Sequence, residues 1–248
     1  MKEIDKYIDE IATKFGYSEM LTSDLKRIIP LMIEGKDEEK RQMLFDTLSS
    51  VKIFVLPENA TNQDLETCKK QVFGKDNDGV TFTQAEQGEY SKVEFAPGAY
   101  ITEPIFDEQM NIVGRNRMLY VKELSRWDNM KEAYHSNINL SHLIHELGHA
   151  WAAEKDEYIQ NENGTFMQRI GTCTITNVVN RETKEVEGIA TEGLHIEEAL
   201  NTIQEEKVLL ALTGAQSIDE LRVKGYVSSA YQGLQKSVMD EYVKKFRY

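Results

Sequence analysis

The segment from His142 to His149, with the sequence HLIHELGH, restricts the fold of this chain more than any other. His145 and His149 are four residues apart, so on a helix they share one face and can bind one metal ion together. Glu146 points to the edge of that face, where its carboxylate can hold and deprotonate a water molecule without taking a coordination position. The spacing therefore predicts a helix that carries a metal site.

The residues around the two histidines also favour a helix. Apolar side chains recur at helical spacing through the segment, at Leu140, Leu143, Ile144, Leu147 and Trp151. Asn139 or Ser141 can cap the first turn by accepting a hydrogen bond from a backbone N–H group. We predict a helix over residues 140–154, with these apolar side chains buried.

A catalytic zinc site usually has three protein ligands plus water, so a third ligand must come from elsewhere. About fifty residues after His149, near the start of a second strongly helical segment, lie Glu197 and Glu198. Glu192, just before that segment, is a weaker candidate. On a helical wheel Glu197 lies nearer the apolar side, but a ligand must face the metal and not the core, so the wheel leaves the choice open. Carboxylates at a helix start also occur without metal, because they stabilise the helix dipole.

The H-E-L-G-H motif with a downstream helix that carries a glutamate resembles the gluzincin group of zinc metallopeptidases. Thermolysin and the catalytic domain of anthrax lethal factor belong to that group. The resemblance implies a hydrolase of peptide bonds in which Zn²⁺ is bound by His145, His149 and Glu198. It also implies that Glu146 is the general base.

Two further assignments follow from the resemblance. The third ligand of the group often lies in an N-E-x-x-x-D stretch, and matching residues 197–202 to it places Glu198 on the ligand and Glu197 on the asparagine. Thr202 stands where an aspartate often orients a zinc histidine, so that contact is left unassigned. A tyrosine or histidine from the C-terminal part often donates to the oxyanion of the tetrahedral intermediate, and we expect Tyr231 in that role.

The remaining histidines have ordinary explanations. His142 shares the face of the two ligands but lies in the first helical turn, which favours a surface role or a contact behind the ligands. His195 precedes the glutamate pair, and His135 lies in a polar stretch that is typical of a loop. Nothing requires either of them to bind metal.

Composition narrows the partners and the location. A net charge of −13 over 248 residues argues against unaided binding to nucleic acid or to an anionic membrane, so the expected partner is a peptide or protein substrate. Cys68 and Cys173 are too few and too scattered for a disulfide framework, which favours two reduced thiols. The first residues lack the apolar core of a signal peptide, and we expect a cytoplasmic protein, unless an export signal lies outside this sequence.

The patterns along the chain indicate an α+β fold of the zincin type. Residues 1–75 are mainly helical, and residues 76–248 form the zincin-like region, packed with the first part as one unit. We predict helices over residues 3–15, 22–34, 37–49, 61–73 and 227–246, and strands over residues 51–56, 79–83, 90–95, 99–102 and 117–124. The later strands make a small, twisted, mostly antiparallel sheet before the metal helix.

Two other segments complete this prediction. Residues 117–124, the last strand before the metal helix, are our candidate for an edge strand to which an extended substrate adds. Residues 165–178 are predicted as one extended segment, followed by a turn at residues 180–183.

Two alternatives stay open on the sequence alone. Peptide deformylase shares the H-E-x-x-H motif but takes a cysteine ligand from a glycine-rich context before the helix, and neither Cys68 nor Cys173 lies in such a context. The other is a non-catalytic or regulatory zinc-binding protein, a cytoplasmic factor that binds or cleaves a repressor. Glu146 argues against an inert site, which has no use for a general base.

Overall fold

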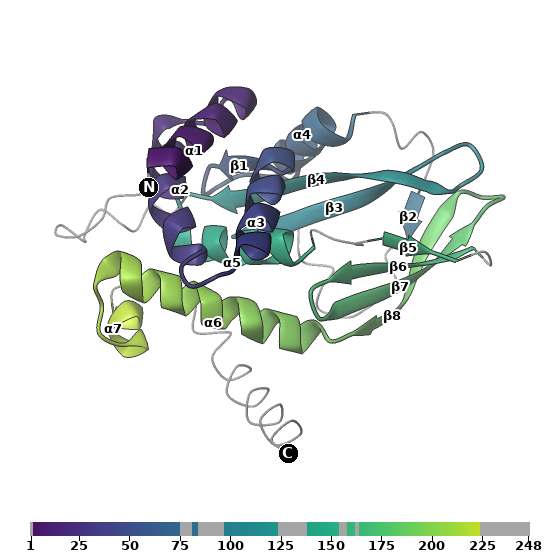
Figure 1. Ribbon diagram of the computed structural model, residues 1–248. Coiled ribbons are helices and arrows are strands. Elements are labelled where there is room, and N and C mark those ends of the chain that lie inside the picture. The colour runs from purple at the N-terminus through teal and green to yellow at the C-terminus, as the bar shows by residue number, and fades with distance from the viewer. Residues whose placement is uncertain are drawn as a thin grey trace, which may run out of the picture.

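The computed structural model describes residues 2–74, 81–83, 97–123, 138–153, 158–161 and 164–223, with the side chains of residues 81–83, 189 and 195 left out. The chain begins with helices, and its middle part forms two sheets (Figure 1). Helices α5 and α6 carry the predicted metal residues. The predicted α+β class and the helical N-terminal region are confirmed.

Three helices open the chain, as predicted. They are α1 (Lys2–Phe15), α2 (Glu19–Met32) and α3 (Glu38–Ser50). The hydroxyl of Ser18 accepts a hydrogen bond from the backbone N–H of Leu21, and the carboxylate of Asp37 accepts one from Lys40. These bonds satisfy N–H groups that have no partner inside a helix. The cap at Ser18 is the reason that α2 begins before residue 22, where the apolar pattern alone placed its start.

The first sheet has three strands, in the order β1 (Lys52–Leu56), β4 (Ile112–Lys122) and β3 (Gly98–Phe106). β1 is parallel to β4, and β3 is antiparallel to it. Our expectation that residues 117–124 form an edge strand is wrong, because β4 is the central strand. Residues 118–121 are all buried, which is the pattern of a strand covered on both faces. Among the described residues, β3 is an edge strand of this sheet.

The second sheet has five strands in the order β2-β8-β7-β6-β5. Their bounds are β2 (Thr81–Thr83), β5 (Tyr158–Gln160), β6 (Thr165–Ile170), β7 (Cys173–Asn180) and β8 (Glu185–Glu192). The prediction of a single small sheet is therefore wrong. Residues 165–178 are not one extended segment, because the chain reverses at Gly171, whose φ of +56° favours glycine.

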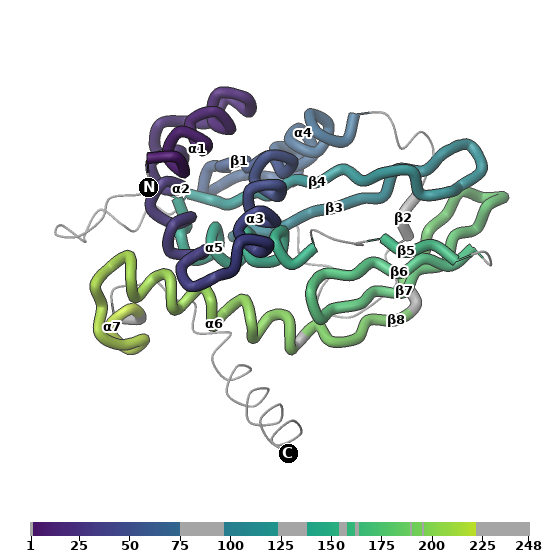
Figure 2. The backbone as a smooth tube through the Cα atoms, in the orientation of Figure 1, coloured from purple at the N-terminus to yellow at the C-terminus, as the bar shows by residue number. Residues whose placement is uncertain are grey.

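Helices cover both faces of the three-stranded sheet (Figures 1 and 2). Met118 and Tyr120 point to α4 (Asn62–Phe73), whereas Leu119 and Val121 point to α5 (Leu140–Ala152). On its other side α5 packs against α6 (Leu194–Thr213), and the core around it also includes residues of α1, α2 and α3. Polar side chains on so enclosed a helix need hydrogen-bond partners.

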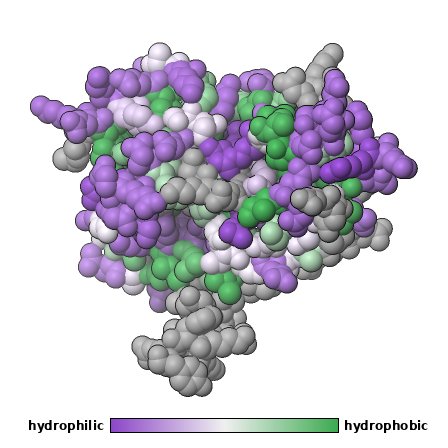
Figure 3. All heavy atoms as spheres, turned by 45° about the vertical axis from the view of Figure 1, so that its right-hand side comes forward, coloured by the Kyte–Doolittle hydropathy of each residue, from purple (hydrophilic) through white to green (hydrophobic). Residues whose placement is uncertain are grey.

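Hydrophilic side chains cover most of the face in Figure 3, and hydrophobic ones form smaller, separate patches. No helix in the described part of the chain is long and apolar enough to cross a membrane. Cys68 and Cys173 are free and buried. The last described helix is α7 (Ile218–Val223); the predicted strand at residues 90–95 and helix at residues 227–246 lie outside the described residues.

Candidate metal centre

Helix α5 places two histidines and a glutamate inside the protein. Of the two residues that could cap it, Asn139 does so, with its side-chain oxygen accepting a hydrogen bond from the backbone N–H of His142. Gly148 allows α6 to approach, because a Cβ atom there would lie 2.4 Å from Oδ1 of Asn201. The close contact of the two helices brings the H-E-x-x-H segment against the start of α6.

His145, His149 and Glu198 form a group that could hold a metal ion. Nε2 of His145 lies 3.0 Å from Oε2 of Glu198 and 3.2 Å from Nε2 of His149, and the latter lies 3.4 Å from Oε1 of Glu198. Ligand atoms about 2.0–2.2 Å from a tetrahedral zinc ion are about 3.3–3.5 Å apart. The donor types and their separations therefore fit Zn²⁺. The side chains of His145, His149 and Glu198 are 6%, 12% and 19% exposed, so the group opens to solvent mainly at Glu198.

A carboxylate that the sequence did not single out orients His145. Oε2 of Glu205 lies 3.1 Å from Nδ1 of His145, and Oε1 of Glu205 accepts a hydrogen bond from the hydroxyl of Ser141. Thr202, at the position where an aspartate was sought, instead donates to the backbone oxygen of Glu198 at 2.8 Å. Glu205 follows Glu198 by seven residues, which is close to two helical turns. The seven-residue spacing is the sequence signal that could have identified Glu205, which lies about one helical turn beyond Thr202.

His149 contacts an amide from helix α6. Nδ2 of Asn201 lies 2.8 Å from Nδ1 of His149 and donates to Oε1 of Glu197 at 3.2 Å. The resemblance matched Glu197 to an asparagine of the gluzincin stretch, but here the asparagine beside the histidine is Asn201.

The three candidate glutamates have different surroundings. Glu198 lies in the metal group. Glu197 is buried and accepts hydrogen bonds from the backbone N–H and hydroxyl of Thr172. Glu192 is exposed at the end of β8. Glu198 as the third ligand stays a prediction, and its position supports it over the other two.

Glu146 contacts the edge strand of the first sheet. It is buried, and its Oε2 accepts a hydrogen bond from the backbone N–H of Tyr100 in β3 at 2.8 Å. Gly98 makes this approach possible, because a Cβ atom there would lie 3.3 Å from Cγ of Glu146 and 3.2 Å from the backbone oxygen of Tyr120. The carboxylate is therefore held between α5 and β3.

The other predicted residues contribute less. Tyr231 lies outside the described residues, as does His135, and the side chain of His195 is not described. His142 is half-buried, its Nδ1 has no hydrogen-bond partner, and burial lowers its pKa. A neutral, half-buried ring fits the predicted contact behind the ligands better than a place on the surface.

The electrostatics of the group are dominated by a buried charge pair. Burial lowers the pKa of His145, but the carboxylates of Glu198 and Glu205 outweigh it and raise this pKa to about 10. Burial also opposes the charge of Glu198, yet hydrogen bonds from His145 and His149 hold its pKa well below the ordinary value. Without metal, His145 is therefore protonated at neutral pH, and a metal that binds its Nε2 must displace that proton.

We expect the metal-free protein to lose stability as the pH rises above neutrality. The His145 contribution is complete below the unfolded pKa of 6.5 and is lost as the pH rises towards about 10, by up to about 1.4 kcal/mol per pH unit. The Glu198 contribution also stabilises the fold but has the opposite pH dependence: it is present above the ordinary value of 4.5 and is lost as the pH falls below it. Urea unfolding of chelator-treated protein at pH 6, 8 and 9.5 measures the decline. An equal decline in His145→Gln, which has no titrating ring, would contradict this origin.

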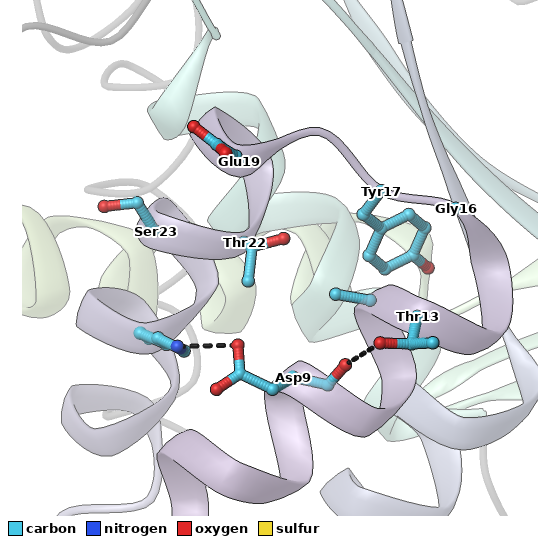
Figure 4. Close-up of a pocket in the computed structure, with 9 residues that line it drawn as sticks. Asp9, Thr13, Gly16, Tyr17, Glu19, Thr22 and Ser23 are labelled. Atoms are coloured by element: carbon cyan, nitrogen blue, oxygen red, sulfur yellow. Dashed lines mark hydrogen bonds and ion pairs between the residues drawn. The ribbon is translucent and has the colours of Figure 1, made fainter.

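A separate hollow lies between α1 and α2, with a cavity volume of about 570 Å³ (Figure 4). Lys26 and Asp9 form an ion pair across it at 2.7 Å, and the hydroxyl of Tyr17 accepts a hydrogen bond from the backbone N–H of Ile53. None of its lining residues belongs to the metal group. The metal group lies instead on α5 and α6.

Comparison with known protein families, with curated proteins and with solved structures finds no match. The function is therefore inferred from the residues of the site.

Proposed function

We propose that the protein is a zinc-dependent metallopeptidase of the gluzincin type. His145, His149 and Glu198 are the zinc ligands in this proposal. The observation that carries it is the set of separations among their donor atoms, 3.0, 3.2 and 3.4 Å, with a buried glutamate next to the first histidine. His145 and His149 were also predicted from the four-residue spacing of the motif, and Glu198 was predicted from the resemblance to the gluzincin stretch.

Each side chain of the site has a role in peptide hydrolysis. Bound zinc would supply Lewis-acid activation of water and of the substrate carbonyl. Glu146 accepts the proton of the attacking water and passes it to the leaving amine. Glu205 accepts from Nδ1 of His145, which keeps Nε2 available as a ligand atom. Tyr231 remains our candidate for the oxyanion donor.

The substrate is proposed to bind as an extended peptide along β3. The backbone N–H of Tyr100 points away from β4, since it donates to Glu146. Residues of an antiparallel strand alternate in direction, so Gly98, Thr102 and Pro104 also face outward. Proline has no N–H to donate. Backbone pairing with a substrate is therefore proposed for the segment from Gly98 to Thr102, next to the general base.

Metal content and hydrolysis together test the proposed function. Protein purified without chelators should contain about one zinc per chain and should cleave an unfolded protein substrate such as casein. Dialysis against a chelator should stop the cleavage, and one equivalent of zinc should restore it. Protein that neither contains zinc nor takes it up at neutral pH would refute the proposal. Full zinc occupancy without cleavage of varied peptides would instead favour a non-catalytic zinc-binding protein.

A further inference from the structure

One backbone N–H group of β3 is already used by the proposed general base. Oε2 of Glu146 accepts a hydrogen bond from the backbone N–H of Tyr100 at 2.8 Å. That N–H is directed away from β4, to the side of β3 on which a substrate strand would add. A backbone N–H carries one hydrogen, so it makes a full hydrogen bond either to the carboxylate or to a substrate carbonyl.

The surroundings of Glu146 favour the carboxylate as the lasting partner of this N–H. Glu146 is 9% exposed, and a Cβ atom on Gly98 would lie 3.3 Å from its Cγ. A buried carboxylate is costly when it loses a hydrogen bond. A charged acceptor also binds an N–H more strongly than a neutral carbonyl does. We therefore expect Glu146 to keep the Tyr100 N–H while a substrate is bound.

The second oxygen of the same carboxylate remains for chemistry. In the described part of the chain, Oε1 of Glu146 has no hydrogen-bond partner. With Oε2 fixed on β3 the side chain is held in one orientation, and Oε1 is left to accept the proton of the attacking water. The strand in this way positions the base.

The occupied N–H also restricts where the scissile carbonyl can lie. Along an added strand, every second residue directs both its C=O and its N–H to the edge of the sheet. The carbonyl opposite Tyr100 finds its donor taken by Glu146, whereas carbonyls opposite Gly98 and Thr102 can pair with the strand. The carbonyl without a donor on the strand, next to the base, is the one that can bind the metal.

We propose that Tyr100 is a positioning residue that holds the general base through its backbone N–H, and that this contact sets the register of the substrate. The scissile carbonyl then lies opposite the Tyr100 N–H, and the substrate residues on either side of it pair with β3. This proposal rests on the proposed function. It assigns the role to the backbone, so it predicts no requirement for a tyrosine side chain.

Removal of this single N–H tests the positioning role. Tyr100→Pro lacks the hydrogen and the ring, whereas Tyr100→Ala lacks only the ring, so their difference isolates the N–H. Pro104 already occupies an outward position of β3, so proline at position 100 should leave the pairing with β4 intact. In zinc-loaded protein, kcat of Tyr100→Pro should lie about tenfold or more below that of Tyr100→Ala, with KM within about threefold. Equal kcat with KM raised about tenfold would show that the N–H pairs with the substrate instead.

Amide hydrogen exchange tests the contact without catalysis. In metal-free protein, the Tyr100 N–H should exchange about tenfold or more faster in Glu146→Ala than in the wild type, because its acceptor is removed. The Ile101 N–H, which is directed to β4, is the control, and its exchange should change less than about twofold. Equal exchange of the Tyr100 N–H in both proteins would contradict the contact on which the proposal depends.

Backbone methylation of a substrate tests the register. The probe is a synthetic peptide that spans a casein cleavage site mapped by mass spectrometry, and its binding to metal-free protein is measured by fluorescence polarisation. A methyl group on the nitrogen of the residue that contributes the scissile carbonyl removes an N–H directed to β3, so the dissociation constant should rise about threefold or more. A methyl group on the preceding nitrogen, which points away from β3, should change it less than about twofold. The reverse pattern would move the register by one residue and refute the proposal.

The outcomes distinguish this proposal from the proposed function. If the wild type cleaves no peptide, the proposed function fails and the register fails with it. If the wild type cleaves peptides but Tyr100→Pro and Tyr100→Ala have equal kcat and KM, only the role of the N–H fails. If Tyr100→Pro does not fold, the methylated peptides decide, because the wild type binds them.

Discussion

Glu146→Gln is expected to abolish peptide hydrolysis while zinc content and fold are kept. Glutamine has almost the same shape as glutamate, but its amide cannot accept the proton of the attacking water. General acid–base catalysis contributes about 10²–10⁴-fold, so kcat/KM should fall by at least about a hundredfold. The measurement is cleavage of a fluorogenic peptide mixture by zinc-loaded protein, with zinc content determined on the same samples.

The contact of Glu146 with β3 makes this variant more informative than a truncation. Oε1 of a glutamine can still accept from the backbone N–H of Tyr100, which donates to Glu146 at 2.8 Å, so the strand should keep its place. Glu146→Ala loses both the base and the strand contact, and comparison of the two separates them. Activity near the wild-type level in Glu146→Gln would show that this side chain is not the base.

Glu198→Ala is expected to weaken zinc binding by about a hundredfold or more. Loss of contacts behind the ligands already costs about 10- to 100-fold, and here a ligand atom itself is removed from a three-residue set. The substitution also leaves the protonated His145 without one of its two carboxylates, Glu198 and Glu205. Competition with a chromogenic chelator at pH 7.5 measures the loss.

The control for this substitution must be another glutamate close in sequence. Glu192→Ala is suitable because Glu192 is exposed, and its zinc affinity should equal that of the wild type. Glu197→Ala is unsuitable, because the carboxylate of Glu197 is buried on Thr172 and its removal disturbs the turn. Loss of zinc in Glu192→Ala, with zinc kept in Glu198→Ala, would contradict the prediction and assign the third ligand to Glu192.

Local features of this protein could be predicted from the sequence because they depend on neighbours along the chain. The four-residue spacing of His145 and His149 places them on one helical face wherever that helix packs. The start of α3 follows from Asp37, three residues before Lys40. The Asp37 side chain accepts a hydrogen bond from the backbone N–H of Lys40. The capping box between Thr61 and Asp64 defines the start of α4 in the same way.

Tertiary structure alone decided which residues surround the metal group. The position of β4 in the centre of its sheet depends on pairing with β1, more than fifty residues away in sequence, and no local pattern specifies such a pairing. The choice between Glu197 and Glu198 depends on the β6–β7 turn, which takes the first carboxylate and leaves the second for His145 and His149. Helix geometry sets neighbouring side chains about 100° apart, but only the packing of α6 against α5 and against that turn determines what each of them faces.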